Sequence, residues 1–314
     1  LLAAGGLAVE EFPVVGLVET GSTSGPVTDS GAAGTALASG IKTYNRAIGV
    51  GPDTVAVELV TEAARRNGTA VGVVATSSVV HATPASFYAH VHDRYEYFEI
   101  ASQAASSGLE VLLGGGREFF RAESRPDGRD LIGIVAEAGA FVETAAELEA
   151  VDPASTDRLT GLFAEDAMPV AAERSPSLAS MTEKALEVLS RAEGGFFLMV
   201  EGSQIDWRSH DNASFEDVAA EVADFDAALR VALDFARSQP RTLIVVTADH
   251  ETGGLAIVQR DGRLTALYAH GSHSAELVPV FAFGPSAELF GGIQGNDAVG
   301  RTLMDLVGGF ADSN

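Results

Sequence analysis

Two long hydrophobic runs in this chain end in acidic residues and a histidine. Residues 196–200 lead directly into Glu201, and residues 242–247 lead, after one alanine, into Asp249 and His250. Continuous apolar runs bounded by polar residues are typical of buried strands, and buried strands indicate a parallel sheet with helices on both faces. Ligands of open α/β sheets bind beyond the carboxyl ends of the strands. The sequence therefore predicts an α/β fold with a polar site at that edge of the sheet.

Strands and helices are expected to alternate along most of the chain. Other expected strands cover residues 13–18, 71–75, 111–113 and 278–283. Expected helices cover residues 31–39, 55–66, 86–91, 177–192, 214–237 and 299–307. This alternation indicates a three-layer α/β/α sandwich with a mostly parallel central sheet. Because no convincing linker interrupts the sequence, residues 1–314 are expected to form a single domain.

The composition excludes several kinds of partner and site. The formal net charge is −24, from 44 acidic and 20 basic residues, and such a field repels nucleic acid and anionic membranes. A site for an anionic substrate must therefore carry its own local positive charge. The sequence has no cysteine, which rules out disulfides and thiolate metal sites. No 18-residue apolar run occurs, so no membrane-spanning helix is expected.

Carboxylate and imidazole groups follow the two hydrophobic runs in a pattern that suits zinc. Asp206 and His210 are four residues apart, so one helical turn brings them to the same face. A buried Asp249 or His250 needs a partner, because an unpaired buried charge is costly. These residues are interpreted as metal ligands. The alternatives are exposed polar residues for Asp206 and His210, and an internal hydrogen-bonded pair for Asp249 and His250. His273 lies in a glycine- and serine-rich segment and by itself is more typical of a surface loop.

A serine stands where a loop of small residues meets a predicted helix. Ser30 lies within residues 27–35, and a helix amino terminus favours phosphate and stabilises an alkoxide. The alternative is an ordinary N-cap serine. Arg94 offers the planar fork that binds phosphate through two hydrogen bonds, although a lone arginine is more often a surface residue. The chain has no G-x-S-x-G motif, so an ordinary α/β-hydrolase is not indicated.

Four segments occur in an order that resembles the alkaline phosphatase family, namely residues 27–43, 81–94, 200–207 and 246–251. The resemblance implies phosphomonoester hydrolysis, with Ser30 as the nucleophile that becomes phosphorylated and Arg94 as the clamp on the phosphate oxygens. It also implies two zinc ions and one magnesium ion as cofactors. The implied metal-site residues are Asp206, His210 and His273 for the first zinc, Asp249 and His250 for the second zinc, Thr83 and Glu201 for the magnesium, and Asp29 beside the nucleophile.

Two positions near the expected phosphate site vary within the family, and in this chain they are His81 and Trp207. Other members carry aspartate and lysine there, so the identity of the third metal stays open. The resemblance further implies a phosphomonoester substrate, inorganic phosphate as a product, a homodimer, and a periplasmic or secreted location. The sequence does not indicate the physiological substrate.

The resemblance has one departure, at the start of the chain. Family members begin with a strand whose aspartate bridges the second zinc and the magnesium, and no such strand precedes Leu1. We therefore expect an N-terminally truncated domain with impaired metal binding. Two other functions stay open: a related metal-dependent phosphodiesterase or sulfatase, and a non-catalytic fragment that binds metal or phosphate.

Overall fold

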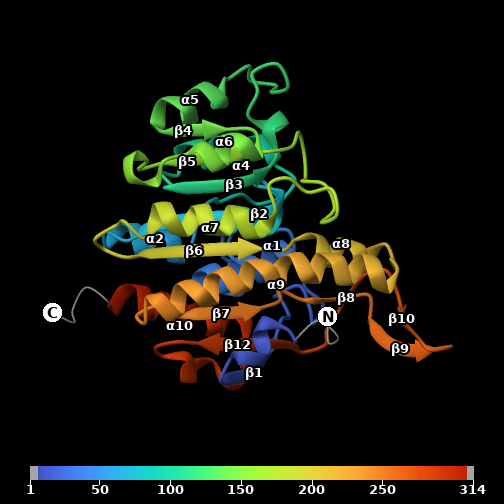
Figure 1. The fold of residues 1–314 in the computed structure, drawn as a ribbon. Coiled ribbons are helices and arrows are strands. Elements are labelled where there is room, and N and C mark those ends of the chain that lie inside the picture. Colours follow the sequence, from blue (N-terminus) through green and yellow to red (C-terminus); the bar gives the residue numbers. More distant parts are fainter. Residues whose placement is uncertain (1–5, 310–314) are drawn as a thin grey trace.

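Two β-sheets form the middle of the molecule in the computed structural model, which describes residues 6–309 (Figure 1). The first sheet has five parallel strands in the order β4-β5-β3-β2-β6. The second has the order β13-β1-β12-β7, in which β1 and β13 are parallel and the other pairs are antiparallel. The strands of the first sheet are β2 (Ala70–Ser78), β3 (Val111–Gly115), β4 (Ala140–Val142), β5 (Leu159–Leu162) and β6 (Phe196–Glu201), and those of the second are β1 (Val14–Glu19), β7 (Ile244–Thr247), β12 (Val278–Phe283) and β13 (Gly292–Gly295).

Helices cover both faces of the two sheets, and the predicted α/β fold class is confirmed. In Figure 1, α7 and α9 lie on the near face and α1 and α2 lie behind the strands. The long helix α9 packs on both sheets: Leu229 and Leu233 join a core with β7, and Phe235 stacks edge-on against Phe196 of β6. The helices are α1 (Ser30–Ser39), α2 (Val60–Arg66), α3 (Ala82–Ala85), α4 (Tyr97–Ser106), α5 (Leu131–Ala138), α6 (Ala145–Ala150), α7 (Leu178–Leu189), α8 (Gln204–His210), α9 (Phe215–Ser238) and α10 (Asn296–Gly309).

The short elements complete the fold. Two antiparallel ribbons, β8 with β11 and β9 with β10, stand apart from the main sheets. The second ribbon is the hairpin that projects at the right of Figure 1. The remaining elements are the strands β8 (Glu251–Thr252), β9 (Ala256–Arg260), β10 (Arg263–Leu267) and β11 (His273–Ser274), and the 3-10 helices η2 (Ala8–Glu11), η3 (Arg117–Phe119), η4 (Pro153–Ser155) and η5 (Ala287–Phe290).

The strand β6 lies at one edge of the first sheet, and β7 lies at one edge of the second sheet. Among residues 6–309, β6 pairs only with β2, and β7 pairs only with β12. Every residue of both strands is partly exposed, although both sequences are apolar. In Figure 1 the two strands lie where the two sheets meet, and they point in the same direction. Their carboxyl ends, which lead to Glu201 and Asp249, therefore lie at the same edge of the molecule.

Two predicted elements differ from the structure. The predicted helix over residues 86–91 is wrong, because the chain there forms turns that end in a β-bridge between Ile48 and Val91. The helix predicted from residue 55 begins only at Val60, where the Glu62 side chain accepts the N–H of Leu59. In residues 6–309, no helix is both long and apolar enough to cross a membrane.

Candidate metal and phosphate site

The residues predicted for the site gather at the carboxyl ends of β2, β6 and β7. In chain order they are Ser30 at the start of α1, Thr83 in α3 after β2, Glu201 at the end of β6, Asp206 and His210 in α8, Asp249 and His250 after β7, and His273 in β11. Contacts between their side chains join these segments, which are far apart in the sequence. The predicted residues therefore lie together at one edge of the sheets, and their binding of metal and phosphate stays a prediction.

Asp206, His210 and His273 form one cluster. One ligand atom from each residue lies within 4.8 Å of the others. The Nε2 atoms of His210 and His273 are 3.0 Å apart, and they lie 3.4 and 3.8 Å from Asp206 Oδ1. Asp206 and His210 share one face of α8, as their spacing predicts. His273 reaches them because β11 pairs with β8, which sets His273 opposite Thr252.

Hydrogen bonds to backbone carbonyl groups orient the two histidine rings of this cluster. His210 Nδ1 lies 3.0 Å from the carbonyl oxygen of Gly271, and His273 Nδ1 lies 2.8 Å from that of Thr28. A carbonyl only accepts, so each Nδ1–H donates and each ring turns its Nε2 towards Asp206. Two imidazole nitrogens and a carboxylate oxygen then converge. Tetrahedral ligands about 2.0 Å from zinc lie about 3.3 Å from one another, so this donor set fits zinc.

A serine, a histidine and an aspartate meet at the start of α1. Ser30 Oγ lies 3.1 Å from His250 Nε2, which lies 3.2 Å from Asp249 Oδ2. Ser30 and His250 are both buried. Burial works to raise the pKa of Asp249, but the charge and hydrogen bond of His250 hold it below its usual range. Burial works to lower the pKa of His250, and the Asp249 carboxylate raises it above its usual value. Asp249 and His250 thus present ligand atoms beside a serine hydroxyl.

The Asp29 carboxylate is surrounded by hydrogen-bond donors. It is the N-cap of α1 and accepts from the N–H of Ala32 at 3.1 Å and of Arg46 at 2.9 Å. It also accepts from a terminal nitrogen of Arg94 at 3.0 Å. Burial opposes its ionisation, but the two backbone N–H groups and the Arg94 guanidinium lower the pKa of Asp29. Asp29 therefore orients Arg94, and its expected place among the metal-site residues stays a prediction.

His81 holds the other terminal nitrogen of Arg94, at 3.2 Å from its Nε2. Burial, followed by the positive charge of Arg94, lowers the pKa of His81 to about 3, so the neutral ring accepts this hydrogen bond. Trp207 packs edge-on against His81, with ring centroids 5.4 Å apart. Both rings line a cavity of about 220 Å³ together with Ser78, Val80, Tyr97, Phe119 and Asp166. His81 therefore lies beside Arg94, and Trp207 lies beside His81; their place near a bound phosphate stays a prediction.

Glu201 is surrounded by hydroxyl groups. Its Oε2 accepts from Ser203 Oγ at 2.6 Å and from Ser77 Oγ at 3.4 Å, and Thr83 also hydrogen-bonds to it. Burial raises the pKa of Glu201 to about 7, and the nearby Asp249 carboxylate adds to the shift. Carboxylate and hydroxyl oxygens are ligands that magnesium accepts. The pair formed by Glu201 and Thr83 therefore fits a hard cation.

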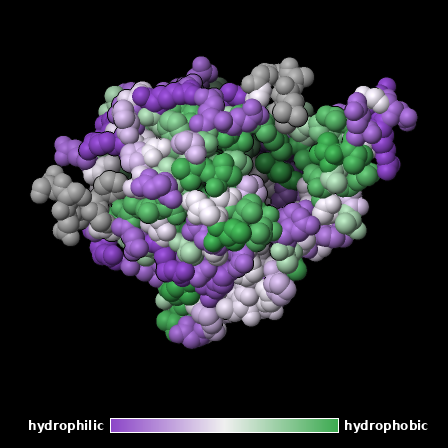
Figure 2. Space-filling view, turned by 90° about the horizontal axis from the view of Figure 1, so that it is seen from below, coloured by the Kyte–Doolittle hydropathy of each residue, from purple (hydrophilic) through white to green (hydrophobic). Residues whose placement is uncertain are grey.

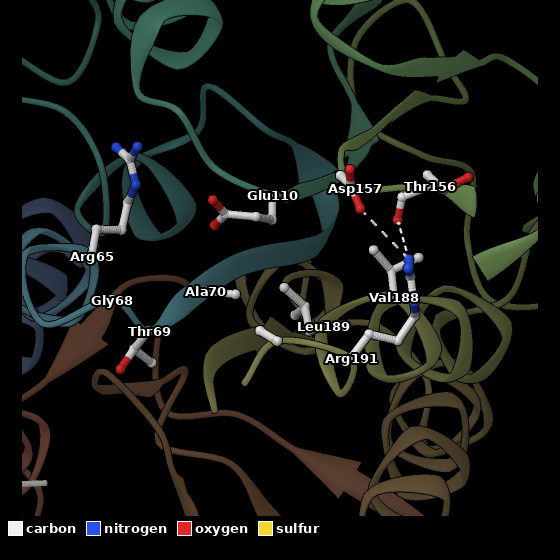
Figure 3. A pocket seen from close by; sticks show the side chains of 11 residues that line it. Arg65, Gly68, Thr69, Ala70, Glu110, Thr156, Asp157, Val188, Leu189 and Arg191 are labelled. Atoms are coloured by element: carbon white, nitrogen blue, oxygen red, sulfur yellow. Dashed lines mark hydrogen bonds and ion pairs between the residues drawn. The ribbon is translucent and has the colours of Figure 1, made fainter. Parts of the chain in front are cut away.

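A separate cavity of about 380 Å³ lies at the opposite, amino-terminal edge of the five-stranded sheet (Figure 3). In Figure 3, Arg65 and Glu110 lie on one side of it, and Arg191 lies on the other beside Asp157 and Thr156. Arg191 is 3.7 Å from the Asp157 carboxylate and donates to the Thr156 carbonyl at 3.1 Å. None of the predicted site residues lines this cavity.

Hydroxyl residues that orient the predicted ligands could not be picked out in the sequence. Thr252 Oγ1 donates to Asp206 Oδ1 and lies 3.3 Å from His250 Nδ1. Ser203 holds Glu201, as described above. Each follows a predicted ligand by two residues, Ser203 after Glu201 and Thr252 after His250. That proximity is a weak signal, because serine and threonine are common next to strands and helix starts.

Comparison with known proteins identifies relatives along most of the chain. The family model described as "Alkaline phosphatase" matches residues 4–267. Alkaline phosphatase 4 of Bacillus subtilis (strain 168) is 42% identical over 241 residues, which is 74% of this chain and 50% of that protein. Alkaline phosphatase of Escherichia coli (strain K12) is 33% identical over 312 residues, which is 83% of this chain and 66% of that protein. The chain spans about half the length of its Bacillus subtilis relatives.

Solved structures agree with these relatives. The alkaline phosphatase from the Antarctic bacterium TAB5 has a TM-score of 0.90 and 39% identity, covering 97% of this chain and 91% of that chain. A histidine-to-glutamate variant of the TAB5 enzyme, with Mg bound in its M3 site, has a TM-score of 0.89 and 38% identity over the same shares.

Proposed function

The chain belongs to the alkaline phosphatase family, and from this membership we propose that it hydrolyses phosphomonoesters through a phosphoserine at Ser30. The observation that carries the proposal is the contact of 3.1 Å between Ser30 Oγ and His250 Nε2 at the amino end of α1. The helix terminus favours the negative charge of a phosphoryl group at this position.

Ser30 supplies the nucleophile in this proposal. Its Oγ attacks phosphorus, the bond between phosphorus and the alcohol oxygen breaks, and phosphoserine and the free alcohol result. A water molecule then attacks phosphorus, the bond to Ser30 Oγ breaks, and inorganic phosphate leaves. Because Ser30 is buried at the first residue of a helix, its hydroxyl attacks from a fixed position.

Arg94 binds and orients the phosphate oxygens. Asp29 and His81 hold its two terminal nitrogens at 3.0 and 3.2 Å, so the guanidinium plane is fixed before the substrate arrives. Its Nε–H is buried and has no acceptor within the described residues 6–309. A phosphate oxygen would give this donor a partner, and the arginine charge offsets the acidic field of the chain.

The chain's own residues form three groups of metal ligands. Asp206, His210 and His273 would hold the first zinc, Asp249 and His250 the second, and Thr83 and Glu201 the magnesium. When bound, the metal ions would supply positive charge to the serine oxygen, the leaving alcohol oxygen and the attacking water. The converging lone pairs of His210 and His273 support the first assignment most directly.

The experiment that tests the proposal is trapping of the phosphoserine. Protein supplied with zinc and magnesium is incubated with labelled phosphate at mildly acidic pH and quenched with acid. We expect stable label in the unaltered protein and none in Ser30→Ala, whose turnover should fall by several orders of magnitude. Ser39→Ala is the matched control, because Ser39 is buried at the other end of α1 and donates to the Thr35 carbonyl. Label retained in Ser30→Ala would refute the role of Ser30.

A second comparison separates phosphomonoesters from related substrates. We propose to measure the hydrolysis of p-nitrophenyl phosphate, bis-p-nitrophenyl phosphate and p-nitrophenyl sulfate by the same preparation. A phosphomonoesterase should prefer the first compound strongly. Preference for the diester or the sulfate would favour the related hydrolases that the sequence analysis leaves open.

We also propose that the chain forms a homodimer through the sheet face of β1 and β13. Val15 and Leu17 of β1 and Ile293 of β13 are 56, 38 and 67% exposed, and Leu289 in η5, which packs against β1, is 50% exposed. Leu17 and Ile293 are direct partners in the β1–β13 ladder, and Figure 2 shows hydrophobic side chains on the face seen from below. Ile293→Glu should therefore convert the dimer to a monomer in light scattering after gel filtration. Ile257→Glu, on the projecting hairpin, should not.

The family resemblance also supports a periplasmic or secreted location, which we propose for the natural protein. Osmotic-shock fractionation of the source cells tests this, with antibody detection of the protein beside a cytoplasmic marker. Recovery of the protein with the cytoplasmic marker alone would contradict the proposed location.

A further inference from the structure

Thr252 lies between residues that belong to two different proposed metal sites. It is buried in β8, and the pairing of β8 with β11 sets it opposite His273. Its hydroxyl oxygen contacts Asp206 Oδ1 on one side and lies 3.3 Å from His250 Nδ1 on the other. Asp206 belongs to the group with His210 and His273, whereas His250 lies beside Ser30. A single hydroxyl therefore contacts both groups.

Hydrogen-bonding capacity fixes the direction of these bonds. An ionised carboxylate only accepts, so the Thr252 hydroxyl donates to Asp206. The hydroxyl oxygen then accepts from His250 Nδ1–H, which turns His250 Nε2 towards Ser30 Oγ at 3.1 Å and Asp249 Oδ2 at 3.2 Å. Asp206 Oδ1 keeps a lone pair for a metal, because each carboxylate oxygen can accept twice.

We propose that Thr252 is a positioning residue that orients the Asp206 carboxylate and the His250 ring together, and so couples the two proposed zinc sites. The inference rests on the proposed function. Groups that hydrogen-bond to metal ligands typically change metal affinity by about 10- to 100-fold. Loss of the Thr252 hydroxyl should therefore weaken zinc binding at Asp206, His210 and His273, although Thr252 is not itself a ligand.

The test compares Thr252→Val, which removes the hydroxyl at nearly constant shape, with Thr252→Ser, which keeps it. Zinc is titrated into the metal-free proteins by calorimetry. We expect Thr252→Val to weaken the tightest binding event by about tenfold, and Thr252→Ser to restore it to within about threefold. Thr247→Val is the matched control, because within residues 6–309 the Thr247 hydroxyl donates only to the Ala248 and Pro279 carbonyls. It should bind zinc as the unaltered protein does.

A second readout follows the His250 ring directly. In nitrogen-15 spectra of the metal-free protein, with His250 assigned from a His250→Gln variant, the proton on Nδ1 should be less populated in Thr252→Val than in Thr252→Ser. Unchanged zinc affinity in Thr252→Val would overturn the proposal. Equal weakening in the valine and serine variants would also overturn it, because the serine variant keeps the hydroxyl and the loss of affinity would then not follow the hydroxyl.

Both readouts are independent of turnover. If the unaltered protein binds zinc but forms no phosphoserine, the proposed function fails while the positioning role of Thr252 can still be judged. If Thr252→Val does not fold, as far-ultraviolet circular dichroism would show, Thr252→Ala provides the same comparison with Thr252→Ser.

Discussion

The Nε2 atoms of His210 and His273 face each other at 3.0 Å, and both rings are protonated on the opposite nitrogen by their bonds to backbone carbonyls. Two imidazole lone pairs at this distance repel unless a cation or a proton lies between them. With Asp206 beside it, this pair supports the first zinc site that we propose.

His273→Ala should therefore remove the tightest zinc site. We expect zinc affinity to fall by more than about tenfold, because loss of a ligand exceeds the loss of a residue that only orients one. Calorimetric titration of zinc into metal-free protein measures the change. His270→Ala is the matched control, since His270 is exposed in the same loop and its ring accepts from the Ser272 N–H. Similar affinities in the two variants would contradict the assignment of His273.

Arg94→Ala should weaken phosphate binding without loss of metal. A guanidinium stays protonated and cannot act as a ligand, whereas charge-assisted hydrogen bonds contribute about 1.5–3 kcal/mol each. We expect KM and the phosphate inhibition constant to rise by about 10- to 100-fold, with zinc content unchanged by atomic absorption. Arg46→Ala is the control, because the Arg46 side chain pairs with Asp93. Loss of zinc from the Arg94 variant would mean that Arg94 has a structural role.

The stability of the metal-free protein should depend on the protonation of Glu201. Its folded pKa of about 7 lies above the ordinary value of 4.5, so the folded state binds the proton more tightly than the unfolded state. The contribution of Glu201 to the free energy of unfolding is therefore greatest below pH 4.5. It declines as the pH rises towards 7, by up to about 3 kcal/mol.

Glu201→Gln should remove that decline. Urea unfolding in the presence of a chelator, at pH 5 and pH 7.5, measures the difference between the variant and the unaltered protein. Glu149→Gln, at an exposed helix position, controls for loss of a charge. If the Glu201 variant and the unaltered protein show the same change between the two pH values, the carboxyl is ionised throughout and our account of its burial is wrong.

The sequence predicts the elements with strong periodic patterns and the residue types at the site. The helix expected over residues 214–237 is α9 (Phe215–Ser238), because its apolar residues recur at helical spacing over many turns. The strand expected over residues 278–283 is β12. Asp206 and His210 share a face of α8 because one helical turn separates them. These predictions depend on local order alone.

Contacts that depend on three-dimensional packing could not be predicted in this way. His273 joins the cluster only through the β8–β11 ribbon, whose strands have two residues each and no distinctive pattern. The tautomers of His210 and His273 are set by carbonyl groups, which every residue carries. The division of the strands into two sheets could not be predicted either. The apolar sequences of β6 and β7 are typical of buried strands, although each strand lies at the end of its sheet.

The last prediction concerns the unequal strength of the three proposed metal sites. The first group offers three side-chain ligands, Asp206, His210 and His273, whereas the second offers Asp249 and His250 and the third Thr83 and Glu201. Zinc sites in proteins usually have three or four protein ligands, so the first group should bind zinc more tightly than the others. Zinc titrated into the metal-free chain should show one tight event per chain, followed by weaker binding.

Two variants assign these events. Asp206→Asn should abolish or greatly weaken the tight event, while Asp249→Asn should leave it in place and change only the weaker binding. Both substitutions remove one carboxylate charge at nearly constant size, so each serves as the control for the other. Two or three tight events of equal affinity in the unaltered chain would mean that the second and third groups have ligands beyond those assigned here. A tight event that survives Asp206→Asn but not Asp249→Asn would reverse the order of the sites, because it would place the strongest zinc ion beside Ser30.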